Sequence, residues 1–203
     1  ICLFSWQSYL FSQYESPRTT TSAQESNTVL APNMPSLNDP EGDAVPEGLP
    51  AVIDAHVHIF PDAIFTAVRN WFDEHGWRIR YRMSTAEIFR FLQKRGIQHI
   101  IALQYAHKPG IARELNQYMV EQLRDFPSLV CGMATVFPGE DQDTTILTEA
   151  FNQGLGGLKL HSHVQCFDMN SEAMERIYEC CGQHQKPIIM HVGQEPKSSA
   201  YRC

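Results

Sequence analysis

The chain lacks an excess of positive charge, and it lacks a regular spacing of cysteines. Lysine and arginine number 16 against 23 acidic residues, which gives a formal net charge of -7 over 203 residues. Such a chain offers no basic surface to a nucleic-acid backbone, so we expect no nucleic-acid partner. The six cysteines, at positions 2, 131, 166, 180, 181 and 203, do not form a disulfide framework. We therefore expect reduced thiols and a cytoplasmic location.

A hydrophobic run long enough to cross a membrane is also missing. The apolar residues between Ile1 and Phe11 are interrupted by Ser5, Gln7 and Ser8. This segment is too short to span a bilayer, and no basic region precedes it as in a signal peptide, so we expect no membrane partner. The hydrophobic content of 43% is typical of a globular domain.

Residues 1–50 lack apolar periodicity and are predicted to form a disordered or non-native arm. From Ser12 to Pro50 the composition is rich in Ser, Thr, Pro, Asn and acidic residues. Met34 lies inside this region, so a start near Met34 is left open. We expect residues up to about 48 to make few contacts with the folded domain, which begins at residue 51.

Strands and helices alternate after residue 51. The predicted strands, recognised by short apolar runs, are residues 52–61, 97–105, 129–137, 155–161 and 187–192. The predicted helices, recognised by apolar residues at helical spacing, are residues 63–75, 84–95, 111–126, 144–152 and 171–184. This alternation predicts an α/β fold with parallel strands and right-handed crossovers.

The first strand carries Asp54, His56 and His58 at alternate positions. Side chains two residues apart in a strand point to the same face, about 6.6 Å apart along the chain. Two imidazoles at this separation can share one metal ion at about 2.1 Å from each nitrogen. Two neighbouring imidazoles and a carboxylate inside a buried strand would otherwise each need a partner, so the metal interpretation is favoured.

A third histidine, His191, lies at the carboxyl end of the fifth strand. In a barrel the first and fifth strands face each other, so His191 can converge with His56 and His58. In an open sheet of sequential order the strands would be about 19 Å apart, too far for one ion. A reordered open sheet would shorten that distance, so the pattern favours a barrel without proving it.

These motifs resemble those of the amidohydrolase superfamily. The resemblance rests on Asp54-x-His56-x-His58, on Gly157-Leu-Lys-Leu-His161 and on Ile189-Met-His-Val-Gly193. The most similar branch includes aminocarboxymuconate-semialdehyde decarboxylase and related metal-dependent hydrolases. The resemblance implies a metal-dependent-hydrolase-type (β/α)8 TIM barrel. It also implies that His56, His58 and His191 bind a divalent metal, with Zn²⁺ expected.

The resemblance covers only the first five βα units. Members of the superfamily complete the site with an aspartate after strand eight and usually a histidine after strand six, whereas this sequence ends at Cys203. The expected fold is therefore a TIM barrel truncated after about strand five, with residues 51–203 as a partial barrel. An exposed edge at strand five and weak metal binding are expected for such a chain.

Strand four carries Lys159 and His161 at alternate positions, so both are expected on one face. We interpret them as groups that bind a substrate anion or support the metal site, and as catalytic candidates. The superfamily resemblance also leaves open a carboxylated Lys159 that bridges two metals. Asp54 is expected to orient a histidine by a hydrogen bond, or else to cap the local backbone.

Arg78, Arg80 and Arg82 alternate with apolar residues between the first two predicted helices. Their ordinary interpretation is a half-exposed strand or loop with solvated cations. The functional alternative is a lid that supplies an arginine to a substrate carboxylate.

The resemblance implies a hydrolase that activates water on a divalent metal to cleave an amide, ester or lactone. A non-oxidative decarboxylase of the same family is the alternative within this class. A catalytically inactive barrel fragment that acts as a binding or regulatory partner is the alternative of another class. The expected partner is a small-molecule substrate with a carboxylate, and a homodimer is left open for the full-length form.

Overall fold

The computed structural model describes residues 40–76 and 78–192. The strands are β1 (Ile53–His58), β2 (His99–Leu103), β3 (Val130–Gly132), β4 (Leu158–His161) and β5 (Ile188–His191). The helices are α2 (Asp62–His75), α3 (Thr85–Lys94), α4 (Ala112–Arg124), α5 (Asp143–Asn152), α6 (Ser162–Gln165) and α7 (Glu172–Gln183). Strands and helices alternate through most of the described chain, as predicted.

The strands are parallel and follow one another in sequence order. β1, β2 and β3 form one sheet, and β4 and β5 form a second sheet. A parallel bridge between Ala134 and Leu158 joins the two sheets. The Ala134 amide donates to the Gly157 carbonyl at 2.8 Å, and the Lys159 amide donates to the Ala134 carbonyl at 2.8 Å. The order β1-β2-β3-β4-β5 is the one that a barrel wall requires.

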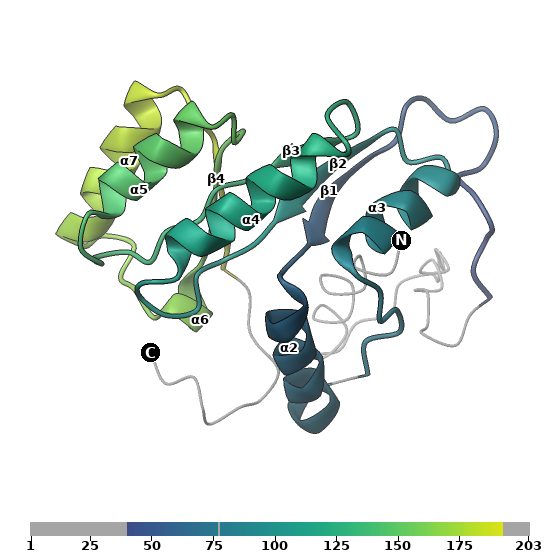
Figure 1. Cartoon of the computed structure of the whole chain (residues 1–203), viewed down its shortest axis with the longest axis horizontal. Coiled ribbons are helices and arrows are strands. Elements are labelled where there is room, and N and C mark those ends of the chain that lie inside the picture. The colour runs from purple at the N-terminus through teal and green to yellow at the C-terminus, as the bar shows by residue number, and fades with distance from the viewer. Residues whose placement is uncertain (1–39, 77, 193–203) are drawn as a thin grey trace, which may run out of the picture.

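The core lies between these strands and the helices that cover one side of them. Figure 1 shows α4, α5 and α7 along the strands, with α2 and α3 nearer to β1. A Cβ on Gly132 would lie 2.6 Å from Met119 Cγ, so only glycine lets β3 approach α4 this closely. The fully buried apolar residues include Val57, Ile100, Met119, Leu147, Leu155, Leu158, Leu160, Met174 and Ile177.

The α3 N-terminus forms as its sequence predicts. The Glu87 carboxylate accepts hydrogen bonds from the Ser84 amide at 2.7 Å and from the Ser84 hydroxyl at 2.8 Å. This carboxylate satisfies a backbone donor that the helix itself leaves unpaired. The same hydrogen bonds to Ser84 hold the pKa of Glu87 below its ordinary value.

Residues 40–50 contain no helix or strand, but they are not loosely attached. The Val45 amide donates to the Arg95 carbonyl at 2.7 Å, and the Arg95 guanidinium donates to the Gly42 carbonyl at 2.7 Å. Glu41 also pairs with Arg95 at 3.7 Å. These contacts attach residues 41–45 to Arg95 at the C-terminus of α3, and the expectation that the arm as a whole makes few contacts with the folded domain stays a prediction. Residues 1–39 of the predicted arm lie outside the described residues.

Among the described cysteines, Cys131, Cys180 and Cys181 are free thiols, with Cys131 exposed and the other two buried. Burial raises the pKa of the Cys181 thiol to about 12. Among the described helices, none combines the length and the apolar character that a membrane crossing requires.

Candidate metal centre

Strand β1 brings His56 and His58 together. Their Nε2 atoms lie 3.1 Å apart, and their ring centroids are separated by 5.0 Å. The pairing of β1 with β2 shifts register between Asp54 and Val57, so one additional β1 residue is accommodated there. Regular alternation therefore does not extend through the whole strand. The two imidazoles nevertheless approach through the same nitrogen, as a shared ligand pair requires.

The surroundings keep both imidazoles neutral. Burial, followed by the charge of Lys159, lowers the pKa of His56 from its ordinary value. Burial and then Lys159 also hold the pKa of His58 well below its ordinary value, and His56, His161 and His191 add to the effect. Neutral imidazole is the form that binds a metal ion.

The distance between the two nitrogens fits a divalent ion. Two imidazole nitrogens that are each about 2.1 Å from a tetrahedral ion lie about 3.4 Å apart, close to the 3.1 Å between these Nε2 atoms. Within residues 40–76 and 78–192, no group of three His, Cys, Asp or Glu side chains is arranged to hold an ion. The structure thus assembles a pair of potential ligands from β1, and the third ligand stays a prediction.

His191 lies with His161 at the carboxyl ends of β5 and β4. The two residues are paired across the ladder, and their rings stack with centroids 4.2 Å apart and planes 19° from parallel. The ring of His163 approaches His191 at 6.5 Å. Burial, followed by the charges of His191 and Lys159, lowers the pKa of His161 to about 2. His161 is therefore neutral throughout the physiological range.

Lys159 is fully buried on β4. Among the described residues its ammonium has no hydrogen-bond partner. Burial lowers the pKa of Lys159 from 10.5 to about 8. A buried cation without an anion beside it is costly, and it marks a position where a ligand anion can be accommodated.

Two aromatic residues that the sequence did not single out line this site. Tyr105 contacts the rings of His58 at 5.7 Å and His161 at 4.9 Å. Phe60 stacks on His58 at 6.3 Å and meets Tyr105 edge-on at 5.3 Å. The sequence signal was weak: Tyr105 is the last residue of a predicted strand, and Phe60 follows His58 by two residues. Apolar aromatics at strand ends are usually core residues, so the pattern alone did not distinguish them.

Asp54 is buried and lies against the backbone of the histidine motif. Its Oδ1 atom accepts a hydrogen bond from the His56 amide at 3.1 Å. This contact is of the kind that a local backbone cap makes, and the alternative role of orienting a histidine ring stays a prediction. The negative charge of Asp54 opposes part of the lowering of the His56 pKa.

The three arginines lie in a loop rather than in a strand. Arg80 pairs with Glu41, and Arg82 donates to Asp73 of α2 at 2.6 Å. Arg78 is exposed. Both ion pairs involve residues outside the histidine cluster, so binding of a substrate carboxylate by one of these arginines stays a prediction.

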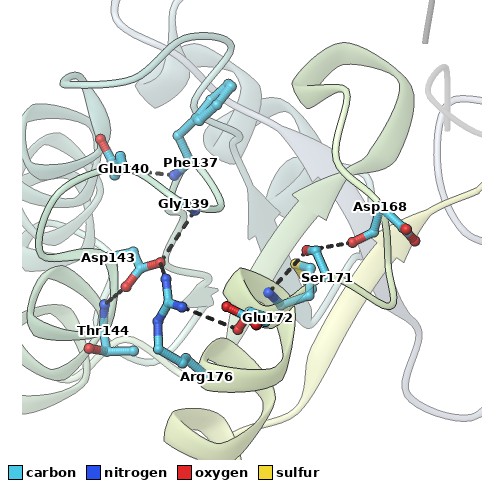
Figure 2. Close-up of polar contacts among 10 residues, drawn as sticks. Phe137, Gly139, Glu140, Asp143, Thr144, Asp168, Ser171, Glu172 and Arg176 are labelled. Atoms are coloured by element: carbon cyan, nitrogen blue, oxygen red, sulfur yellow. Dashed lines mark hydrogen bonds and ion pairs between the residues drawn. The ribbon is translucent and has the colours of Figure 1, made fainter.

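The loop between β3 and α5 is held in place by two carboxylates. Glu140 accepts from the Phe137 amide at 2.8 Å and from the Gly110 amide of the preceding loop at 2.7 Å. Buried Asp143 accepts from the Thr144 amide at 2.8 Å and pairs with Arg176 of α7 at 3.3 Å (Figure 2). These contacts join the connections that follow β2 and β3 to the first turns of α5 and α7.

Comparison with solved structures places this arrangement in a known fold. An amidohydrolase II superposes with a TM-score of 0.57 at 17% identity, over 73% of this chain and 52% of its own. A 2,6-dihydroxybenzoate decarboxylase from Rhizobium gives a TM-score of 0.54 at 16% identity, over 74% and 53%. A 5-carboxyvanillate decarboxylase from Novosphingobium aromaticivorans, with bound manganese and 3-methoxy-4-hydroxy-5-nitrobenzoic acid, gives 0.53 at 15% identity, over 72% and 52%.

The chain spans about half the length of these structures, and it forms about half of an amidohydrolase-type TIM barrel. No curated protein is similar enough to count as a match. The family model described as Amidohydrolase matches residues 53–202, from the start of β1 to the residue before Cys203. The chain therefore belongs to the amidohydrolase family.

Proposed function

We propose that this chain carries the metal-binding and anion-binding part of a metal-dependent hydrolase that acts on a small carboxylate substrate. The observation that carries the proposal is the 3.1 Å approach of the His56 and His58 Nε2 atoms beside the buried ammonium of Lys159. The two neutral imidazole nitrogens suit a divalent metal ion, and the buried ammonium of Lys159 suits an organic anion.

His56 and His58 would hold the ion, and His191 is the proposed third ligand. Zinc is the proposed metal because imidazole suits it, while a structural neighbour holds manganese. When bound, a divalent ion supplies a Lewis acid that lowers the pKa of water towards about 7 and polarises a substrate carbonyl.

The other residues of the site bind and orient the substrate. Lys159 pairs with its carboxylate, and the gain is large because the ammonium is already removed from water. His161 stays neutral, so it can form a hydrogen bond with the substrate without adding a buried charge to the site. Phe60 and Tyr105 exclude water from one side of the imidazole pair.

Decarboxylation is a second candidate reaction. It is favoured by the structural neighbours that act as decarboxylases on 5-carboxyvanillate and 2,6-dihydroxybenzoate. In this reaction Lys159 would hold the substrate near the ion, and a carboxylate would leave as carbon dioxide. Kinship of fold alone does not choose between the two reactions.

The test compares both reactions in zinc-loaded protein extended through strand eight of the expected barrel, because weak metal binding is expected of the partial barrel alone. One assay follows hydrolysis of N-acyl amino acids and lactones, and the other follows carbon dioxide released from hydroxybenzoates. We expect metal-dependent turnover in the hydrolytic assay and a loss of at least about 100-fold in His58→Asn. Exposed His99, at the amino end of β2, provides the matched control, and His99→Asn should stay within about twofold of wild type. Equal turnover in both variants, or turnover that survives removal of the metal, would contradict the proposal.

A further inference from the structure

Tyr105 lies between the two groups of histidines. It follows the carboxyl end of β2, and His58 is paired with Leu103 of that strand. Its ring meets His58 at an interplanar angle of 81° and Phe60 at 82°, and it leans on His161 at 57°. The ring of Tyr105 therefore contacts both a histidine of β1 and a histidine of β4.

The backbone is fixed on both sides of Tyr105. The Gln104 amide group donates to the Leu115 carbonyl of α4 at 2.7 Å. The Ala106 amide donates to the Thr135 hydroxyl at 3.0 Å. Gln104, Ala106 and Thr135 are all fully buried, so these bonds do not exchange with water. Tyr105 is thus held at a defined height above the sheet before any ligand binds.

Thr135 is itself held by a reciprocal pair of hydrogen bonds. Its amide donates to Asn116 Oδ1 at 2.8 Å, and the Asn116 side chain donates back to the Thr135 carbonyl at 2.9 Å. A buried polar network in which these groups satisfy one another is rigid. Through these hydrogen bonds, α4 and the segment after β3 fix the position of Ala106, the residue next to Tyr105.

The ring of His58 needs such support. A histidine that binds a metal through one nitrogen usually donates its other ring N–H to a carboxylate or carbonyl, and this bond sets the ring plane. Among the described residues, Nδ1 of His58 has no hydrogen-bond partner. Its ring is instead bounded by the edge contact with Tyr105 and by the near-parallel ring of Phe60.

We propose that Tyr105 is the positioning residue that sets the ring plane of His58, and thereby the approach of the His56 and His58 Nε2 atoms. The expected effect on metal affinity rests on the proposed function. The other part of the inference, that an aromatic ring orients His58 in place of a hydrogen bond, does not depend on the reaction.

The first test measures Co²⁺ binding to the 203-residue chain by visible absorption. Tyr105→Leu should weaken Co²⁺ affinity at least tenfold, the range found when groups that orient a metal ligand are lost. Tyr105→Phe keeps the ring and should stay within about twofold of wild type. Tyr118, a partly buried tyrosine of α4 whose hydroxyl contacts Thr85 at 2.7 Å, provides the control Tyr118→Leu, which should retain the affinity.

Equal weakening in Tyr105→Leu and Tyr118→Leu, or a Tyr105→Phe variant as weak as Tyr105→Leu, would overturn the inference. Should Tyr105→Leu not fold, Tyr105→Met replaces it, because the unbranched, flexible methionine side chain adapts to an irregular gap and carries no ring. A wild-type chain that binds no Co²⁺ contradicts the proposed function instead. In that case ¹⁵N spectra of the imidazoles decide: Tyr105→Leu should move the two His58 nitrogen shifts towards their average, and unchanged shifts would overturn the inference.

Discussion

The buried position of Lys159 lowers the stability of the fold, so stability does not explain it. Lys159 is fully buried, and its ammonium lacks a hydrogen-bond partner among the described residues. A folded protein tolerates such a charge when its function uses it. The fall of the Lys159 pKa from 10.5 to about 8 corresponds to about 3 kcal/mol by which burial disfavours the charged form.

This penalty predicts how the stability of the chain depends on pH. Between pH 8 and 10.5 the unfolded chain binds more protons at Lys159 than the folded chain, so the free energy of unfolding should rise with pH across this window. Below pH 8 both states are protonated and the full penalty applies. Lys159→Met should therefore raise the free energy of unfolding at pH 7 by about 1–3 kcal/mol.

Urea unfolding at pH 7 and at several pH values up to 10 measures this effect. The Lys159→Met variant should show a flatter pH dependence than wild type. Lys94, exposed on α3, provides the control, and Lys94→Met should leave the slope unchanged. Identical slopes for wild type and Lys159→Met would show that the folded chain already compensates the buried charge.

The residues of the candidate site were predictable only where their chemistry is distinctive. Histidines two apart in a strand predict a shared face, and the Nε2 contact between His56 and His58 agrees with that expectation. The bulge that follows Asp54 was not predictable, because register depends on the neighbouring strand. Tyr105 was missed because an aromatic residue beside a strand has the same pattern whether it fills the core or supports a histidine.

At the scale of elements, a buried carboxylate helps to hold the connection between β3 and α5. Figure 2 shows Asp143 between the amides of Gly139 and Thr144 and the guanidinium of Arg176. One carboxylate thus joins the loop after β3, the first turn of α5 and helix α7. Its loss would leave two partly buried backbone donors, the amides of Gly139 and Thr144, without this acceptor.

Asp143→Ala should lower the free energy of unfolding by about 1–3 kcal/mol, measured by urea denaturation. Asp143→Asn retains an oxygen acceptor for one amide and should cost less. The control is Glu149→Ala, which removes an exposed carboxylate that pairs with Arg113 at 2.9 Å and should have a smaller effect than Asp143→Ala. A loss in Glu149→Ala as large as that in Asp143→Ala would contradict this account of the loop.

Helices were predicted more closely than strands. The helical periodicity places α2, α4, α5 and α7 to within one or two residues of their observed ends. The predicted strand 129–137 is only Val130–Gly132, because beyond it the chain changes partner and forms a single bridge at Ala134. The four-residue helix α6 was not predicted, since one turn is too short for a periodic pattern.

At the scale of the whole molecule, the sequential strand order is what brings distant histidines to one edge. The strands are parallel and follow sequence order, so the carboxyl ends of all five lie at the same edge. The sequence favoured a barrel because His191 would need such a wall to approach β1, and its convergence with His56 and His58 stays a prediction. The ring orientations were not, because they depend on contacts among side chains from β1, β2 and β4.

The central claim is that β1 holds a divalent ion between His56 and His58. Crystals of the chain soaked in zinc and measured at the zinc absorption edge test it directly. The account predicts that the strongest anomalous difference peak lies about 2.1 Å from Nε2 of both residues, and that His58→Asn removes it. A peak beside His161 and His191 with none at the β1 pair, or a peak that survives His58→Asn, would contradict the claim.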